Sequence, residues 1–125
     1  MRETRDHAIA FTDLSDSTRL FRELGDGAAR DLTFGRDPDS AVVVADEFAS
    51  RVHAVAEVDT MRFKLIDRSA NGTYVAIDGT LGEARVLRGE TLLHGGGRIS
   101  LGRPLADPLA QPIVFRRDQR ALFRV

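Results

Sequence analysis

Two short stretches of the chain carry side chains that are suited to binding a phosphate group. The first, FASRVH, contains Ser50, Arg51 and His53, and the second, SANGTYV, contains Asn71. A phosphate ester carries nearly two negative charges and three acceptor oxygens, so it calls for hydroxyl and cationic donors. A serine hydroxyl and an arginine fork supply them. The amide of Asn71 can both donate to and accept from the backbone of an extended peptide. Binding of a phosphate on a peptide is therefore the chemistry that we expect.

A third feature, the pair Gly35-Arg36, lies upstream of both stretches and offers another arginine fork beside a small residue. Each feature has a simpler explanation when it is taken alone. Arg36 and Arg51 can be solvated surface cations, and Ser50 can be a turn hydroxyl. The dipeptide Asn71-Gly72 is also the commonest turn of two-residue β-hairpins. Only the combination of the three features points to a site.

Composition indicates one globular domain. The chain has 125 residues, of which 42% are hydrophobic and 30% are charged, and its net charge is −1. A broad nucleic-acid surface is not expected from this charge. The run AVVVA is among the longest apolar runs, far below the ~18 residues of a membrane span. Charge returns at Asp13, too early for a signal peptide, so we expect a cytoplasmic protein. Because cysteine is absent, disulfides and cysteine-based zinc sites are excluded.

From residue 32 onward the sequence favours short β-strands separated by turn residues. In RFKLID, Phe63, Leu65 and Asp67 alternate with Arg62 and Lys64, as is typical of a half-buried strand. A spacing of roughly ten residues per strand indicates a β-sandwich or barrel. The predicted strands lie in the runs LTFG, AVVVA, VHAVAEV, RFKLIDR, GTYVAI, ARVLRG, RISLG and PIVFRR.

The first part of the chain has a different pattern. AIAFTD at residues 8–13 is a strand candidate. Residues 15–32 are predicted to form a helix, because Leu20, Phe21 and Leu24 recur at helical spacing. The fold class expected is therefore mainly β with one N-terminal α-helix.

The β-rich part resembles a forkhead-associated (FHA) domain, a reader of phosphothreonine peptides. The marks of that family are a Gly-Arg pair, then Ser-x-x-His, then Asn-Gly-Thr. They match Gly35-Arg36, Ser50 to His53, and Asn71-Gly72-Thr73, in the family's order and spacing. The stretch LLHGGGRISLGR is similar to the loop and strand that precede the family's last strand. The resemblance covers residues 32–116.

The resemblance implies a twisted antiparallel β-sandwich over residues 32–125 and assigns roles to its motif residues. The residues implied to bind the phosphopeptide are Arg36, Ser50 and Arg51 at the phosphate and Asn71 at the peptide. The residues implied to support the site are Gly35, His53, Gly72 and Thr73. His53 is expected to brace the loop of Ser50 from below, and Ser50 is expected to offer its N–H as well as its hydroxyl.

The chain departs from the family's pattern in two places. Ala70 stands where the family usually has Thr or Ser, whose hydroxyl joins the phosphate cage, and Ser69 is expected to face the other way. The family also has two strands before its Gly-Arg pair, where this chain has a helical pattern. Loss of those strands would leave an open sheet edge, through which a homodimer can form.

Residues 7–30 are similar to the start of a class III adenylate or guanylate cyclase domain, in the stretch HAIAFTDLSDSTRLFRELGD. The resemblance implies that Asp13 is a vestigial candidate for the first of two metal-binding carboxylates. The second carboxylate and the transition-state residues belong to segments that the chain lacks, and two-metal chemistry requires both carboxylates. We therefore expect no bound metal and no catalysis. The whole chain resembles a bacterial cyclase–FHA protein without its cyclase core.

The sequence thus predicts a cyclase-like strand and helix over residues 1–31 and an FHA-like domain over residues 32–125. The expected function is that of a signalling module that binds a phosphothreonine-containing protein or peptide, without enzymatic activity or cofactor. Nucleic acid and membrane are not expected partners. One alternative is a cyclase-related protein that makes a cyclic nucleotide only if a partner supplies the missing core. Another is a degraded remnant or an interaction domain that binds no phosphate.

Overall fold

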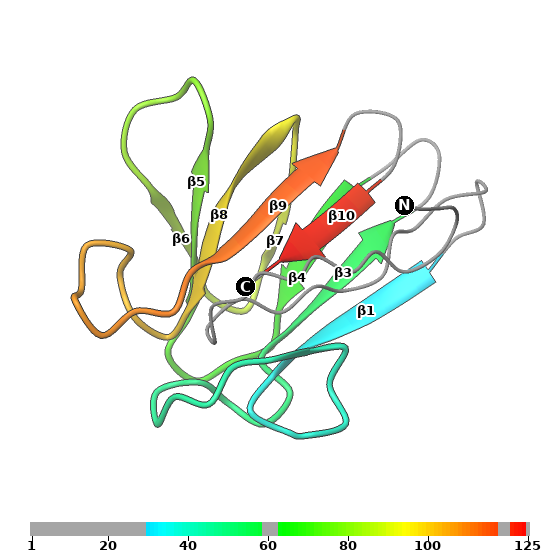
Figure 1. Ribbon diagram of the computed structural model, residues 1–125, viewed down its shortest axis with the longest axis vertical. Coiled ribbons are helices and arrows are strands. Elements are labelled where there is room, and N and C mark those ends of the chain that lie inside the picture. Colours follow the sequence, from blue (N-terminus) through cyan, green and yellow to red (C-terminus); the bar gives the residue numbers. More distant parts are fainter. Residues whose placement is uncertain (1–29, 59–62, 118–120, 125) are drawn as a thin grey trace.

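Ten β-strands form the part of the chain that the computed structural model describes, which is residues 30–58, 63–117 and 121–124 (Figure 1). The strands are β1 (Arg30–Gly35), β2 (Val42–Val43), β3 (Ala54–Val58), β4 (Phe63–Asp67), β5 (Thr73–Ile77), β6 (Ala84–Val86), β7 (Glu90–Leu92), β8 (Gly96–Leu101), β9 (Ile113–Arg117) and β10 (Ala121–Arg124). They form two five-stranded sheets, with the orders β2-β1-β3-β4-β7 and β10-β9-β8-β5-β6. Neighbouring strands are antiparallel except β1 and β2.

The core lies between the two sheets. In β4, Phe63, Leu65 and Asp67 are buried and the residues between them are half-buried, so the predicted alternation is confirmed. The ring of Phe63 contacts that of Phe115 in the other sheet edge to face, with centroids 5.7 Å apart. Each large apolar side chain buried in this way contributes about 1.5–3 kcal/mol. These contacts make the two sheets a single β-sandwich.

The prediction of a mainly β fold is confirmed, and each of these eight predicted runs overlaps a strand. Two further strands, β7 and β10, were not predicted. β7 lies at a sheet edge, has only three residues and leaves Glu90 and Leu92 exposed, so it is too short and too exposed to give a clear pattern in the sequence. The domain boundary predicted between residues 31 and 32 falls inside β1.

The strand predicted over residues 8–13, most of the helix predicted over residues 15–32 and the candidate metal carboxylate Asp13 lie outside the described residues. The last three residues of that helix, 30–32, are strand, and there the helix prediction is wrong. They pair with β3, and Leu32 packs against the core, so tertiary pairing overrides the local pattern. In the part of the chain that the structure describes, no helix is long and apolar enough to cross a membrane.

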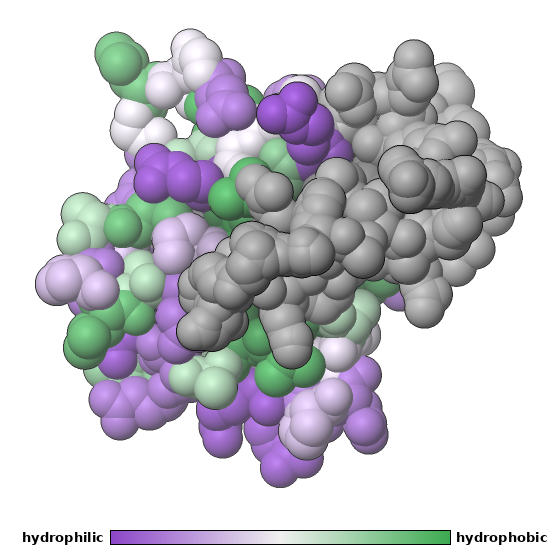
Figure 2. Space-filling view, in the orientation of Figure 1, coloured by the Kyte–Doolittle hydropathy of each residue, from purple (hydrophilic) through white to green (hydrophobic). Residues whose placement is uncertain are grey.

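The strand registers bring several loops to one end of the sandwich. Phe34 pairs with Ala54, and Ala54 pairs with Asp67, so β1 and β4 end where β3 begins. In the other sheet, Thr73 pairs with both Val86 and Leu101. Figure 1 shows the teal connection between β1 and β3 at the bottom of the view. Purple, hydrophilic residues gather along that edge in Figure 2.

Candidate functional site

Gly35 allows two loops to lie against each other at the end of β1. A Cβ atom added there would lie 2.1 Å from the carbonyl oxygen of Arg51 and 2.9 Å from that of Ser50. The N–H of Arg36 donates to the carbonyl of Ser50, over 2.9 Å, and the N–H of Asp37 donates to that of Arg51, over 3.1 Å. Gly35 is therefore needed for space, and the pairing places Arg36 beside the loop of Ser50.

Two arginine side chains are exposed at this junction. Arg36 donates from Nε to the carbonyl of Ala49, over 2.9 Å, which anchors the inner nitrogen of its fork. The side chain of Arg51 is 70% exposed, and its Nη2 lies 3.6 Å from the carboxylate of Asp37. An exposed ion pair of this length is weak, so it does not compete strongly with a doubly charged ligand. Both cations can therefore reach a bound anion.

His53 joins the two loops from below, as expected. Its ring is fully buried. Its Nδ1 accepts a hydrogen bond from the N–H of Ser50, over 2.9 Å, and its Nε2 lies 2.8 Å from the carbonyl oxygen of Gly72. A neutral ring with its proton on Nε2 satisfies both contacts. The N–H of Ser50, which we expected to face the phosphate, is thus committed to His53, and that part of the prediction is wrong.

Ser50 and Asn71 connect the same two loops at the surface. The hydroxyl of Ser50 accepts a bond from the N–H of Ala70, over 3.2 Å, which leaves its proton free to donate to a ligand. The side chain of Asn71 donates from Nδ2 to the carbonyl of Phe48, over 3.0 Å. One of the two hydrogens on this nitrogen therefore bridges the loops. The other N–H and the side-chain oxygen of Asn71 remain a donor and an acceptor for a peptide backbone.

The loop between β4 and β5 is built on a buried carboxylate that the sequence analysis did not select. Asp67 accepts bonds from the N–H and hydroxyl of Ser69, the hydroxyl of Thr73 and the N–H of Arg88, over 2.6–3.1 Å. Burial by itself raises the pKa of Asp67, but the bonds from Arg88, Thr73 and Ser69 outweigh it and hold the pKa below its usual range. The sequence signal that could have identified Asp67 is an acidic residue at an inward-facing position of an alternating strand.

Two supporting residues complete this loop. Gly72 has a φ of +93°, which favours glycine, and its N–H donates to the hydroxyl of Ser69. Thr73 is fully buried, with its hydroxyl bonded to Asp67. Ser69 is buried too, so its hydroxyl points inward, as expected. The strands on either side belong to different sheets, so the alternative of a simple hairpin turn at Asn71-Gly72 is wrong.

The structure predicts that the domain loses stability as the pH falls below about 6.5. Burial holds the pKa of His53 below the ordinary value of 6.5, against the opposing effects of Gly72 and Asp67. The unfolded chain then binds a proton that the folded chain does not, so the free energy of unfolding falls with decreasing pH, by up to about 1.4 kcal/mol per unit. Below pH ~4, protonation of unfolded Asp67 adds to this loss.

Urea titrations between pH 7.5 and 5 would measure this effect in the variant His7→Gln/His94→Gln, in which His53 is the remaining histidine. A flat free energy of unfolding over this range would contradict the prediction.

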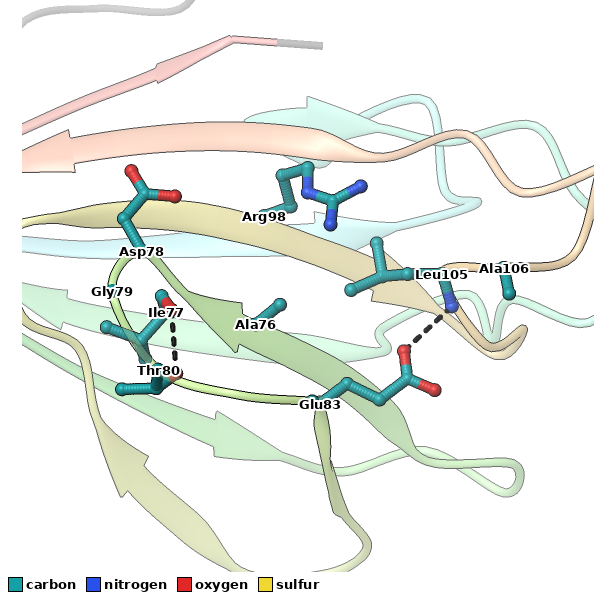
Figure 3. Close-up of a pocket in the computed structure, with 10 residues that line it drawn as sticks. Ala76, Ile77, Asp78, Gly79, Thr80, Glu83, Arg98, Leu105 and Ala106 are labelled. Atoms are coloured by element: carbon teal, nitrogen blue, oxygen red, sulfur yellow. Dashed lines mark hydrogen bonds between the residues drawn. The ribbon is translucent and has the colours of Figure 1, made fainter.

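A separate pocket of about 530 Å³ lies between the β5–β6 connection and residues 105–106 (Figure 3). Asp78, Glu83 and Arg98 line it. Glu83 accepts a hydrogen bond from the N–H of Leu105, so two segments of the pocket wall are joined to each other. The candidate site residues do not line this pocket. Among the described residues there is also no group of three or more His, Cys, Asp or Glu side chains that could hold a metal ion.

The fold and the candidate site together define a class of protein: a two-sheet β-sandwich with exposed arginines on the loops at one end. The sequence profile of the FHA domain matches residues 32–102, more than half of the chain. The chain therefore belongs to the FHA domain family. No match to it was found among curated proteins.

Solved FHA structures share the fold. FHA-1 of Mycobacterium tuberculosis Rv1747 is 24% identical, with a TM-score of 0.50, and the match covers 86% of this chain and 90% of that one. A structure from a study of phosphothreonine-dependent FHA domain interactions is 23% identical, with a TM-score of 0.50 and coverages of 86% and 91%. M. tuberculosis EmbR in complex with a low-affinity phosphopeptide is 22% identical, with a TM-score of 0.50, covering 85% of this chain and 24% of EmbR.

Proposed function

We propose that this chain is a signalling module that binds phosphothreonine-containing peptides and has no catalytic activity of its own. The observation that carries the proposal is that two exposed cations flank Ser50 on a loop that His53 braces. Arg36 bonds to the carbonyl of Ala49, the residue before Ser50, and Arg51 is the residue after it. Recognition of a phosphorylated motif by an arginine-rich site is a known mode of peptide binding. Two similar structures come from work on a phosphothreonine-dependent interaction and on a phosphopeptide complex, which supports the proposal.

Each group has a role in the proposed complex. The terminal nitrogens of Arg36 and the guanidinium of Arg51 neutralise the phosphate, and the hydroxyl of Ser50 donates to one of its oxygens. Asn71 meets the peptide backbone beside the phosphate. Its loop is already tied down by bonds within the chain, so little ordering free energy is lost on binding. The hydroxyl that the family usually has at residue 70 is absent, because this residue is alanine. The N–H of Ala70 bonds to the hydroxyl of Ser50.

The remaining parts of the proposal concern the segment before β1 and the setting of the protein. We propose that the cyclase-like stretch up to residue 30 is a remnant without turnover and that the protein is cytoplasmic. A homodimer through an open sheet edge stays a prediction. Formation of cyclic AMP from ATP and Mn²⁺ by the purified chain, abolished in Asp13→Ala, would restore the cyclase alternative.

Replacing Arg36 with alanine is expected to weaken phosphopeptide binding ~10- to 100-fold. A charge-assisted bond to phosphate contributes about 1.5–3 kcal/mol, and this variant removes the fork that makes it. The measurement is calorimetric titration with a degenerate phosphothreonine peptide library and its unphosphorylated twin. Arg98→Ala is the matched control, because it removes an exposed arginine from the separate pocket.

The wild-type titration tests the function itself, since a library that binds equally with and without phosphate would refute the proposal. If the wild-type chain discriminates but folded Arg36→Ala binds as tightly, Arg36 does not belong to the site.

A further inference from the structure

Arg103, the second residue after β8, reaches back to the segment that precedes Ser50. Its Nε donates to Asp46, over 2.7 Å, and its Nη1 donates to Asp107, over 3.2 Å. Its guanidinium also lies over the ring of Phe48, 4.2 Å from the centroid, and the side chain is only 10% exposed. The contact with Asp46 joins residues 57 positions apart in the chain. We call Arg103, Asp46 and Phe48 the Arg103 latch.

The latch shapes the loop that carries the candidate site. The other carboxylate oxygen of Asp46 accepts the N–H of Phe48, over 2.8 Å, and its carbonyl accepts the N–H of Ala49, over 3.0 Å. These bonds form a tight turn over residues 46–49, and the carbonyls of its last two residues accept bonds from site residues. The carbonyl of Phe48 accepts the side chain of Asn71, and that of Ala49 accepts Nε of Arg36.

The backbone beside Arg103 reinforces the same arrangement. Gly102 has a φ of +84°, and a Cβ atom there would lie 2.3 Å from the carbonyl oxygen of Phe48. Its N–H donates to the carbonyl of Gly72, over 2.9 Å, which is also the carbonyl that His53 contacts. The end of β8 therefore touches both loops of the candidate site.

We propose that Arg103 is a positioning residue of the phosphopeptide site, which acts through Asp46 and Phe48 to fix Arg36 and Asn71. This inference rests on the proposed function. Three carboxylates, those of Asp46, Asp107 and Glu47, lie within 3.6 Å of the guanidinium, so its charge is balanced inside the protein. The contribution of Arg103 to binding comes from geometry rather than from its charge.

Two substitutions that change the net charge in opposite directions distinguish a geometric role of Arg103 from an electrostatic one. Arg103→Gln removes a positive charge and Asp46→Asn removes a negative one. If Arg103 acted by attracting the phosphate, the first variant would weaken binding and the second would strengthen it. The latch requires both to weaken it, by about tenfold each. Because they break the same contact, the double variant should also lose about tenfold and not a hundredfold.

The experiment is calorimetric titration of the full chain and these three variants with the phosphothreonine peptide library, each checked for cooperative thermal unfolding. Arg98→Gln is the matched control and should bind like the wild type, since Arg98 lies in the separate pocket. Tighter binding by Asp46→Asn, or additive losses in the double variant, would overturn the latch.

A second readout does not depend on any ligand. In NMR spectra of the free chain, the side-chain amide of Asn71 and the N–H of Ser50 should shift in Arg103→Gln and Asp46→Asn. They should not shift in Arg98→Gln. The N–H of Asp78, bonded to Gly96 at the far end of the sandwich, should stay in place and report a folded domain. If the wild type binds no phosphopeptide, the proposed function fails. Independently of that result, unchanged Asn71 and Ser50 signals in Arg103→Gln and Asp46→Asn would overturn the latch.

Discussion

Gly35→Ala is expected to destabilise the domain by about 3 kcal/mol and to remove phosphopeptide binding. The new Cβ atom would lie 2.1 Å from the carbonyl oxygen of Arg51 and 2.8 Å from its carbonyl carbon. Both are backbone atoms, so no side chain can rotate away to make room. Overpacking of this kind costs about 1–3 kcal/mol or more. The loop that moves is the one that carries Ser50 and Arg51, so the site is lost together with the stability.

Gly89→Ala is the matched control for this substitution. Neither Gly35 nor Gly89 has a positive φ, so alanine at either position does not strain the backbone conformation. The nearest atoms to a Cβ at Gly89 lie 3.9 Å and 4.0 Å away, which is ordinary contact. A surface change of this kind alters the free energy of unfolding by no more than about 0.5 kcal/mol. Guanidinium unfolding curves and peptide titrations measure both effects, and equal stabilities of the two variants would contradict the argument.

Asp67→Ala is expected to cost about 4 kcal/mol of folding free energy. Four donors would lose their acceptor: the N–H and hydroxyl of Ser69, the hydroxyl of Thr73 and the N–H of Arg88. A buried donor without a partner costs about 1–3 kcal/mol, and water entering the space offsets part of the total. Because these bonds shape the loop that carries Asn71, the remaining folded protein should also bind phosphopeptide more weakly.

The control for this variant is Asp78→Ala, which removes an exposed carboxylate and should change stability by no more than about 0.5 kcal/mol. Asp67→Asn provides an intermediate case, since its amide keeps one acceptor oxygen and the side-chain volume. The expected order of unfolding midpoints is wild type and Asp78→Ala together, then Asp67→Asn, then Asp67→Ala. If Asp67→Ala melts with the wild type, the carboxylate does not hold the loop.

The features predicted correctly are those that depend on neighbours along the chain. The alternation in β4 is a property of consecutive residues, and burial of one face follows from it. The turn role of Gly72 likewise follows from its own backbone freedom. Strand limits were less predictable. β1 begins at Arg30 because β3 offers it hydrogen-bond partners, which a local helical pattern does not reveal.

The sequence by itself determined the class of fold and the order and spacing of the motif residues Gly35-Arg36, Ser50, His53 and Asn71. Only the tertiary structure decided which atoms of those residues remain for a ligand. The N–H of Ser50 is bonded to His53, and one N–H of the Asn71 side-chain amide is bonded to the carbonyl of Phe48. The physical reason is that Asn71 bonds to a loop 23 residues away in the chain, and the ring of His53 that receives Ser50 also contacts Gly72, 19 residues away. These partners depend on how the loops pack in the folded domain and not on the spacing of residues along the chain.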